Sequence, residues 1–255
     1  MLKNKAINHT NKMEYYFNDK IWNSVNNSTI YKEDIELSTD IVGTIPEIEL
    51  FPSGTIEISA IAYMENKGSK IAALNFANYY TPGGGFIDGC MAQEEACCHQ
   101  TNLYNVLSKI QGFYENHRNT DDLHKNEGIY TPNIIIDKDE IPFDIEDNTE
   151  IDIISVAAPN YSGFSWKYKD PLAKYKNEIA LKSRIRFVLD IAQKENVDVL
   201  ILGAFGCGVF GQNPTEVAKI FRRYLTSKLY SFKKIIFAIP DENSNNFIAF
   251  KDVFK

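Results

Sequence analysis

The chain has 255 residues, of which 44% are hydrophobic and 24% are charged, with a net charge of −7. It is long enough to bury a sizeable core, and it has no apolar run of 18 residues and no apolar signal segment at its N-terminus. Its four cysteines, two of them adjacent, do not form a disulfide framework. We therefore expect a cytoplasmic monomer that does not enter a membrane and does not bind nucleic acid in general, since such binding depends on basic patches.

The N-terminal region is polar and rich in Asn over residues 1–50. One short helix is predicted there, at residues 14–25, and its Trp22 could pack on the core. Residues 1–65 contain no recognisable motif. The sequence therefore predicts an N-terminal extension, residues 1–65, and a main domain, residues 66–255.

The remainder of the chain alternates between predicted strands and predicted helices. The strands are expected at residues 71–75, 128–136, 151–157, 197–202 and 234–239, because these runs are rich in β-branched residues. The helices are expected at residues 94–114, 171–195, 214–229 and 245–254. This alternation predicts an α/β fold, a three-layer α/β/α sandwich with a mixed sheet. The acidic segment 137–150 is expected to be a solvated loop.

Eight of the fourteen glycines fall in two short stretches, residues 83–89 and 203–211. The first begins with the glycine triplet 83–85 and ends shortly before Glu94 and Glu95, which open a predicted helix. Consecutive glycines let the backbone approach a ligand, so that N–H groups can point at phosphate or sugar oxygens. Acidic residues at a helix N-terminus also have a purely structural explanation. They complement the helix dipole and stabilise the helix by about 0.3–1 kcal/mol. The combination with the glycine triplet favours a functional site.

The second glycine stretch follows an apolar strand and leads into a helix, with Asn213 as the predicted N-cap and Pro214 as the first helical residue. Such a loop suits a phosphate group. Gly206, Gly208 and Gly211 also match the dinucleotide-binding fingerprint. That motif belongs after an early strand and before an acidic residue about 20 positions on, and neither condition holds here. We retain the phosphate loop and reject a hydride-transfer enzyme.

These motifs resemble those of poly(ADP-ribose) glycohydrolases, in particular the microbial branch of that family. The resemblance extends over residues 70–240 and includes Cys98 and the segments 75–78, 83–85, 93–95, 102–104, 156–160 and 203–210. His99 departs from the pattern, because relatives often carry Arg at this position. The resemblance implies that the main domain is a macrodomain-like glycohydrolase catalytic domain without a metal or a cofactor. It would hydrolyse ribose–ribose bonds, mainly at the chain ends of poly(ADP-ribose) or of ADP-ribosylated proteins, with ADP-ribose as the product.

The resemblance also assigns roles to single residues. Glu95 is expected to be the general acid and base of glycosidic cleavage, and Glu94 is expected to hold the ribose hydroxyls. The expected substrate-binding residues are Asn78, Gly83, Gly84, Gly85, Gln93, Gly206, Cys207, Gly208, Val209 and Phe210.

Several alternatives remain open at this point. The protein could be an ADP-ribose reader without catalysis, or a hydrolase of mono-ADP-ribosyl groups. A zinc site at Cys90, Cys97, Cys98 and His99 lacks the ligand spacing of structural zinc sites. Cys207 is the one candidate for a nucleophilic thiol, although a small buried residue is the simpler interpretation. The residues that contact adenine are not predicted.

Overall fold

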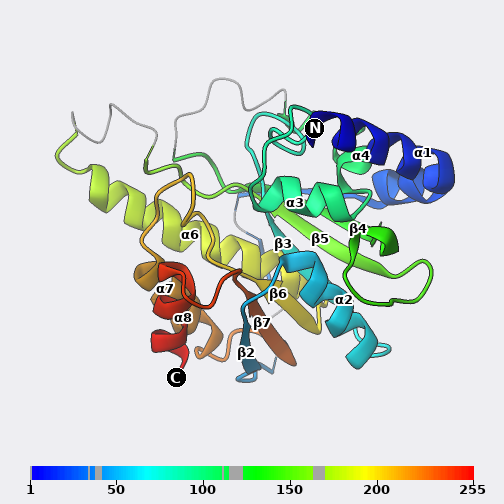
Figure 1. Cartoon of the computed structure of the whole chain (residues 1–255). Helices are drawn as coiled ribbons and strands as arrows, with labels where there is room; N and C mark the ends of the chain where they lie inside the picture. Colours follow the sequence, from blue (N-terminus) through cyan, green and yellow to red (C-terminus); the bar gives the residue numbers. More distant parts are fainter. Residues whose placement is uncertain (1, 34, 38–41, 111, 115–122, 163–169) are drawn as a thin grey trace.

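A seven-stranded sheet between two layers of helices forms the body of the protein in the computed structural model, which describes residues 2–33, 35–37, 42–110, 112–114, 123–162 and 170–255 (Figure 1). The order of the strands is β1-β4-β5-β3-β6-β7-β2. The sheet is mixed and has helices on both faces. The predicted three-layer α/β/α fold is therefore confirmed.

The strands are β1 (Thr29–Lys32), β2 (Glu47–Phe51), β3 (Ile71–Phe76), β4 (Glu127–Ile135), β5 (Glu150–Val156), β6 (Val199–Leu202) and β7 (Lys234–Ala238). The helices are α1 (Leu2–Asn27), α2 (Thr55–Glu65), α3 (Gln93–Gln100), α4 (Leu103–Leu107), α6 (Ala173–Lys194), α7 (Pro214–Leu225) and α8 (Asn245–Phe254), with a 3₁₀ turn η2 (Lys138–Glu140). The five predicted strands are confirmed to within two residues at each end. None of the helices that the structure describes has the length and hydropathy needed to cross a membrane.

Most neighbouring strands are parallel. Strand β3 pairs in parallel with β5 and β6, and β7 pairs in parallel with β6 and β2. Strand β4 is antiparallel to both β5 and β1. Because the carboxyl ends of parallel strands meet at one edge, the loops after β2, β3, β5, β6 and β7 gather there. Ligands of open α/β sheets bind at this edge.

Two hydrophobic cores lie on the two faces of the sheet. On β3, Ala72 and Leu74 pack in the core that includes α6, α7 and α8, whereas Ile71 and Ala73 pack in the core that includes α1, α2, α3 and α4 (Figure 1). Successive side chains of a strand point to opposite faces, so both must be apolar when both faces are covered. This explains why the central strands appear as continuous apolar runs.

The N-terminal region is more structured than the sequence predicts. Helix α1 is 26 residues long, with a kink at Phe17, so the predicted short helix was correct in type but wrong in extent. Trp22 does not pack on the core, because 46% of its surface is exposed. The buried residues of α1 are Ala6, His9, Met13, Ile21 and Ser24. Because His9 and Ser24 are polar, the buried stripe does not look apolar in the sequence.

Three more elements, β1, β2 and α2, precede residue 66. Strand β2 pairs with β7 at one edge of the sheet. Ile56 of α2 is buried in the hydrophobic core where α2 packs against β3 and β6. Elements on both sides of residue 65 therefore share one sheet and one core. The division into an extension, residues 1–65, and a catalytic domain, residues 66–255, stays a prediction about organisation.

The predicted helix 94–114 is wrong, because the chain leaves the helix at Thr101 and Asn102, between α3 and α4. Thr101 is extended and forms an isolated β-bridge with Ile136. The Asn102 N–H donates to the Ile135 carbonyl over 3.2 Å, and Asn102 Oδ1 accepts from the Ile135 N–H over 3.0 Å. These bonds to the end of β4 replace the helical bonds.

The acidic segment 137–150 connects β4 and β5, as expected, but it is not wholly solvated. Asp137 is buried, and Lys12 of α1 donates to both of its carboxylate oxygens over 2.7 Å. Although burial opposes ionisation, hydrogen bonds from His9 and Lys12 lower the pKa of Asp137 to about 2. The start of this segment therefore anchors α1.

Candidate active site

A cavity of about 470 Å³ lies at the edge of the sheet where the parallel strands end. Eight predicted site residues line it, namely Asn78, Gln93, Glu94, Glu95, Gly206, Gly208, Val209 and Phe210. They come from the loop after β3, the first turn of α3 and the loop after β6. The structure thus brings together two motifs that lie more than a hundred residues apart in the sequence.

Backbone N–H groups hold both oxygens of the Glu95 carboxylate. Gly85 N donates to Oε1 over 2.8 Å, and Ala92 N donates to Oε2 over 3.0 Å. Ala92 is the N-cap of α3 and Glu95 is its third helical residue, so the second bond follows from how the helix begins. Glu95 is buried, and its carboxylate has a fixed orientation in the cavity wall.

Glu94 is buried more deeply and has different partners. Its Oε1 accepts from Asn75 Nδ2 over 3.2 Å, and its Oε2 accepts from Asn78 N over 2.7 Å. Burial raises the pKa of Glu94 to about 8, and the neighbouring charge of Glu95 adds to this effect, while the two hydrogen bonds oppose it. The Glu94 carboxyl therefore keeps its proton at neutral pH.

The raised pKa of Glu94 predicts a pH dependence of stability. Because the pKa rises from 4.5 to about 8 on folding, the protonated carboxyl stabilises the fold fully below pH 4.5, and this contribution is lost as the pH rises through 8. Glu94→Gln cannot ionise, so its melting temperature should fall less than that of the wild type between about pH 5 and about pH 8.5. Glu65→Gln, at an exposed carboxyl at the end of α2, is the control. Identical pH profiles of wild type and Glu94→Gln would contradict the assignment.

The backbone at Gly84 lies against both carboxyl groups. Gly84 has a φ of +57°, and a Cβ at this position would lie 2.6 Å from Glu95 Oε1 and 3.1 Å from Glu94 Oε2. Only glycine fits both the left-handed conformation and the space. The triplet Gly83, Gly84 and Gly85 does not itself line the cavity, but it holds the carboxyl groups that do.

The side-chain amide of Gln93 forms hydrogen bonds with other parts of the protein. Its Oε1 accepts from Phe76 N over 2.8 Å, and its Nε2 donates to Leu74 O over 2.9 Å and to Thr55 Oγ1 over 3.1 Å. The side chain thus joins the start of α3 to the end of β3 and the start of α2. A contact between Gln93 and substrate stays a prediction.

Asn78 caps its own loop. Its Oδ1 accepts from Tyr80 N over 2.8 Å and from Thr81 N over 3.0 Å. The amide oxygen is therefore engaged in the turn, and a hydrogen bond to a ligand would come from the amide NH₂ group.

The loop after β6 is firmly anchored. Asn213 is confirmed as the N-cap of α7, since its Oδ1 accepts from Glu216 N over 3.1 Å. Gln212 Nε2 donates to Pro159 O over 2.7 Å and to Asn177 Oδ1 over 2.8 Å. These bonds hold the loop against the end of β5 and against α6. The N-terminus of α7 therefore follows a loop of fixed shape.

Gly206 and Gly208 have different surroundings in this loop. Gly206 has a φ of +74°, and a Cβ there would lie 2.8 Å from Ala158 Cβ, so this glycine is needed for the fold of the loop. A Cβ at Gly208 would meet no protein atom within 4 Å, although Gly208 lines the cavity. A side chain at Gly208 would therefore extend into space that a ligand could use.

The remaining predicted residues of this loop differ in burial. Burial raises the pKa of the Cys207 thiol to about 12, which favours the protonated thiol and argues against a nucleophilic role. Phe205 is buried in the core against Phe76, whereas Phe210 is half-buried and lines the cavity. Val209 is 77% exposed.

The cysteines near α3 have no metal-binding arrangement. Cys97 and Cys98 are buried, and burial raises the pKa of both thiols. His99 is buried beside Phe86, and burial lowers its pKa. Within the described part of the chain, no three His, Cys, Asp or Glu side chains lie together as metal ligands would. Activity without a metal stays a prediction.

Sequence reasoning missed part of the cavity wall. The additional lining residues include Gly54, Thr55, Gln100, Pro240, Ser244 and Asn246. Gly54 and Thr55 follow β2, which was not predicted. Ser244 is the N-cap of α8, because its Oγ accepts from Phe247 N over 3.1 Å. This capping serine directly before a predicted helix was an available signal for that part of the wall.

A sheet edge that holds paired, buried glutamates under a glycine loop is the arrangement expected of a macrodomain-like glycohydrolase. The family model of the microbial-type PARG catalytic domain, where PARG denotes poly(ADP-ribose) glycohydrolase, matches residues 1–139. The chain belongs to this family, and the resemblance inferred from its motifs is confirmed.

Solved structures of this family resemble the whole chain. Poly(ADP-ribose) glycohydrolase from Thermomonospora curvata is 25% identical, with a TM-score of 0.83 over 99% of this chain and 98% of that chain. The same enzyme bound to the inhibitor ADP-HPD is 26% identical, with a TM-score of 0.81 over 98% of each chain. The enzyme from Deinococcus radiodurans in complex with ADP-ribose is 26% identical, with a TM-score of 0.78 over 92% of this chain and 96% of that chain. No curated protein sequence matches this chain.

Proposed function

We propose that this protein hydrolyses the ribose–ribose O-glycosidic bonds of poly(ADP-ribose) and releases ADP-ribose, mainly from chain ends. The observation that carries the proposal is the pair of buried glutamates, Glu94 and Glu95, in the wall of a cavity of about 470 Å³. Family membership and the likeness to glycohydrolase structures with ADP-ribose and ADP-HPD support it. The proposed reaction needs neither a metal nor a cofactor.

In the proposed mechanism, Glu95 acts first as an acid and then as a base. It protonates the oxygen of the leaving ribose while the glycosidic C–O bond breaks, which leaves an oxocarbenium-like sugar. Water then adds to the anomeric carbon and gives a proton to the Glu95 carboxylate, which restores the acid. The bonds from Gly85 N and Ala92 N support this role because they fix the carboxylate in both steps.

Glu94 is proposed to hold the ribose hydroxyls in line for cleavage. Its raised pKa gives it a proton at neutral pH, so its carboxyl can donate one hydrogen bond to a sugar oxygen. The same proton makes Glu94 the second candidate for the general acid. Substitution of each glutamate by Gln distinguishes the two assignments.

The diphosphate of ADP-ribose is proposed to lie against the loop after β6. Gly206, Gly208 and Val209 line the cavity just before the N-terminus of α7, where backbone N–H groups and the helix dipole favour an anion. Phe210 is proposed to pack beside the reacting ribose. Asn78, which lines the cavity, is proposed to contact the ribose from the loop after β3. Gly83, Gly84 and Gly85 do not line the cavity, and a contact of the triplet with the ribose stays a prediction.

Gly208→Val tests the position of the diphosphate. A Cβ at Gly208 would meet no protein atom within 4 Å, and Gly208 lines the cavity, so the fold should persist. The affinity for ADP-ribose should fall by about tenfold or more, which corresponds to about 1.4 kcal/mol. Calorimetry measures the affinity, and thermal denaturation checks the fold. An unchanged affinity in the folded variant would show that the diphosphate binds elsewhere.

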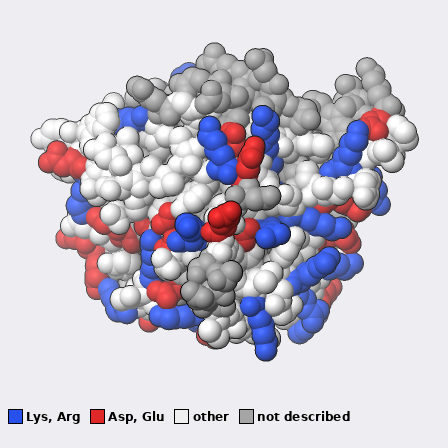
Figure 2. Space-filling view, turned by 180° about the vertical axis from the view of Figure 1, so that it is seen from behind, with Lys and Arg blue, Asp and Glu red and all other residues white. Residues whose placement is uncertain are grey.

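The charge of the protein limits how it can bind a polyanion. The net charge is −7, and Lys and Arg side chains lie among Asp and Glu side chains over most of the rear surface (Figure 2). We therefore propose that affinity comes from the cavity, which takes one terminal ADP-ribose, and that nucleic acid in general is not bound. We also propose that the protein is a cytoplasmic monomer. In the cytoplasm, the free thiols of all four cysteines would stay reduced.

Incubation of the purified protein with labelled poly(ADP-ribose), followed by separation of the products, tests the proposed function. ADP-ribose should accumulate from the beginning of the reaction, at the same rate with and without EDTA. Binding of ADP-ribose without its release from polymer would support the alternative that the protein is a non-catalytic ADP-ribose reader. Activity restricted to mono-ADP-ribosylated protein would support the alternative hydrolase.

A further inference from the structure

The first turn of α1 lies against the loop that carries the glycine triplet, which we call the glycine loop (residues 83–92). Gly89 has a φ of +84°, and a Cβ there would lie 2.9 Å from Lys3 N and 3.2 Å from Leu2 Cβ. Lys3 Nζ also forms an ion pair with Asp88 over 3.2 Å. Helix α1 is therefore one of the supports of the glycine loop.

Phe86 links the glycine loop to the interior. Its side chain is completely buried, with its ring edge-to-face to His99 of α3 at 4.7 Å and to His9 of α1 at 6.4 Å between centroids. Phe86 directly follows Gly85, whose N–H donates to Glu95. Glycines impose no conformation of their own, so the direction of this N–H group depends on the packing of the Phe86 ring together with backbone bonds of the loop, such as Cys90 N to Gly85 O over 3.0 Å.

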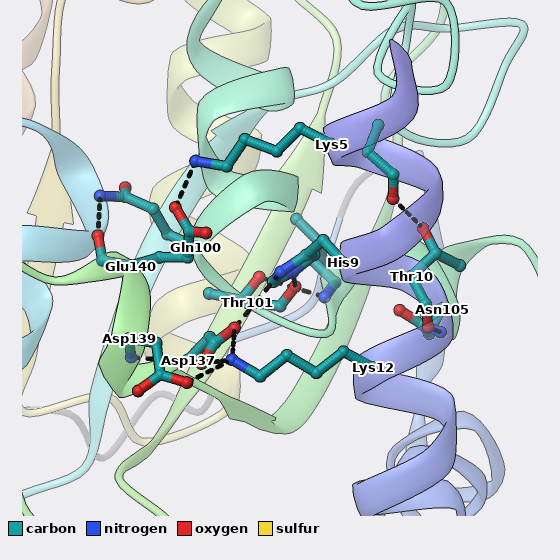
Figure 3. A network of polar contacts seen from close by, with 12 residues as sticks. Lys5, His9, Thr10, Lys12, Gln100, Thr101, Asn105, Asp137, Asp139 and Glu140 are labelled. Atoms are coloured by element: carbon teal, nitrogen blue, oxygen red, sulfur yellow. Dashed lines mark hydrogen bonds and ion pairs between the residues drawn. The ribbon is translucent and has the colours of Figure 1, made fainter. Parts of the chain in front are cut away.

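His9 is held in place at both ring nitrogens (Figure 3). Its Nε2 lies 2.9 Å from the Thr101 carbonyl oxygen, and its Nδ1 lies 3.3 Å from Asp137 Oδ2. His9 and Asp137 are both buried, and Lys12 binds the same carboxylate. The plane of the His9 ring next to Phe86 is therefore fixed by hydrogen bonds.

Both partners of His9 are bonded to the end of α3. Thr101 Oγ1 donates to Cys97 O over 2.8 Å, and Asp137 N donates to Gln100 O over 2.9 Å. His9 is thus linked to the last turn of α3 through Thr101 and Asp137, and its ring contacts Phe86 of the glycine loop. The first turn of the same helix carries the paired glutamates.

We propose that His9 is a positioning residue for glycosidic hydrolysis, and that Asp137 orients it. Through Phe86, His9 keeps the Gly85 N–H directed at the Glu95 carboxylate. This inference rests on the proposed function, but it concerns a group that lines no part of the cavity. Loss of the ring would leave a space next to Phe86 into which the ring and the attached glycine loop could shift.

The test compares His9→Ala and His9→Gln with wild type in kcat, KM and ADP-ribose affinity. A displacement of about 1 Å at the reacting groups costs about 10²-fold in rate, so kcat of His9→Ala should fall by at least about tenfold. KM and ADP-ribose affinity should change by less than about threefold, because the loop after β6 is untouched. His9→Gln keeps an amide donor for the Thr101 carbonyl and should recover part of kcat.

Ser24→Ala is the matched control, since Ser24 is also a buried polar residue of α1 and donates to Asn133 O over 3.0 Å, away from the glycine loop. It should lower the melting temperature without lowering kcat. An equal loss of kcat in Ser24→Ala and His9→Ala would overturn the proposal, because His9 would then act only through stability. An unchanged kcat in His9→Ala would also overturn it.

Hydrogen exchange provides a readout that does not depend on activity. The backbone amides of the glycine loop should exchange faster in His9→Ala than in wild type, and Ser24→Ala should not show this change. If wild type released no ADP-ribose from polymer, the proposed function would fail while this measurement still decided whether His9 holds the loop. Equal exchange in wild type and His9→Ala would overturn the positioning role.

Discussion

Glu95→Gln is expected to slow the release of ADP-ribose from polymer by about 10⁴-fold or more. A general acid or base contributes about 10² to 10⁴ in rate, and here one carboxyl serves both steps. Gln has the size of Glu but cannot donate a carboxylic proton or accept one from water. The affinity for ADP-ribose should change by less than about tenfold, because the loop after β6 is unaltered. A time course of ADP-ribose release, with binding measured in parallel, checks both expectations.

Glu94→Gln is the natural comparison, because it lies in the same helical turn and keeps an oxygen that accepts from Asn78 N. If Glu94 only holds ribose hydroxyls, its substitution should cost less rate than that of Glu95. A greater loss in Glu94→Gln would assign the general acid to Glu94, whose pKa is raised to about 8. Substantial activity in Glu95→Gln would remove Glu95 from the chemistry.

Gly84→Ala is expected to reduce the rate by about 10²-fold, since a small displacement of reacting groups is sufficient for such a loss. The new Cβ would lie 2.6 Å from Glu95 Oε1. The carboxylate or the loop must therefore move, although no catalytic atom is removed. Single-turnover hydrolysis of labelled polymer measures the effect on the chemical step.

Gly68→Ala separates this steric effect from backbone strain. Gly68 has a φ of +82° and would have no atom within 4 Å of an added Cβ, and it lies between α2 and β3, outside the cavity lining. Both variants impose an unfavourable left-handed conformation, at a cost of about 1–2 kcal/mol in stability. Gly68→Ala should therefore be less stable than wild type and fully active. Normal activity in Gly84→Ala would mean that the loop does not restrain the glutamates.

The parts of the fold that could be predicted are those in which local sequence carries the whole signal. The central strands are covered on both faces and so are continuous apolar runs, and α7 begins at an Asn-Pro pair that both caps and starts a helix. The edge strands β1 and β2 are short and partly exposed, and polar residues stand beside the apolar ones in both. The alternation of Glu and apolar residues in β2 was a usable signal of a half-buried strand.

The candidate site was predicted where a motif has fixed spacing, and missed where distant segments meet. Glu94 and Glu95 were predicted from their distance to the glycine triplet together with the resemblance of the whole motif to the family. The break at Thr101 and Asn102 depends on bonds to the end of β4, and Asn246 reaches the cavity only because β7 lies beside β6. Such partners are set by the topology of the sheet, which local sequence does not specify.

The pairing of β2 with β7 joins an early segment of the chain to a late one, and the helices that follow the two strands, α2 and α8, supply Thr55 and Asn246 to the cavity. Contacts between such distant segments form at a high cost in chain entropy and depend on most of the sheet being in place. A partly folded chain therefore has an incomplete binding cavity even when α3 is formed. Catalytic competence should appear in refolding only with the slowest phase, which makes enzymatic activity a direct measure of complete folding.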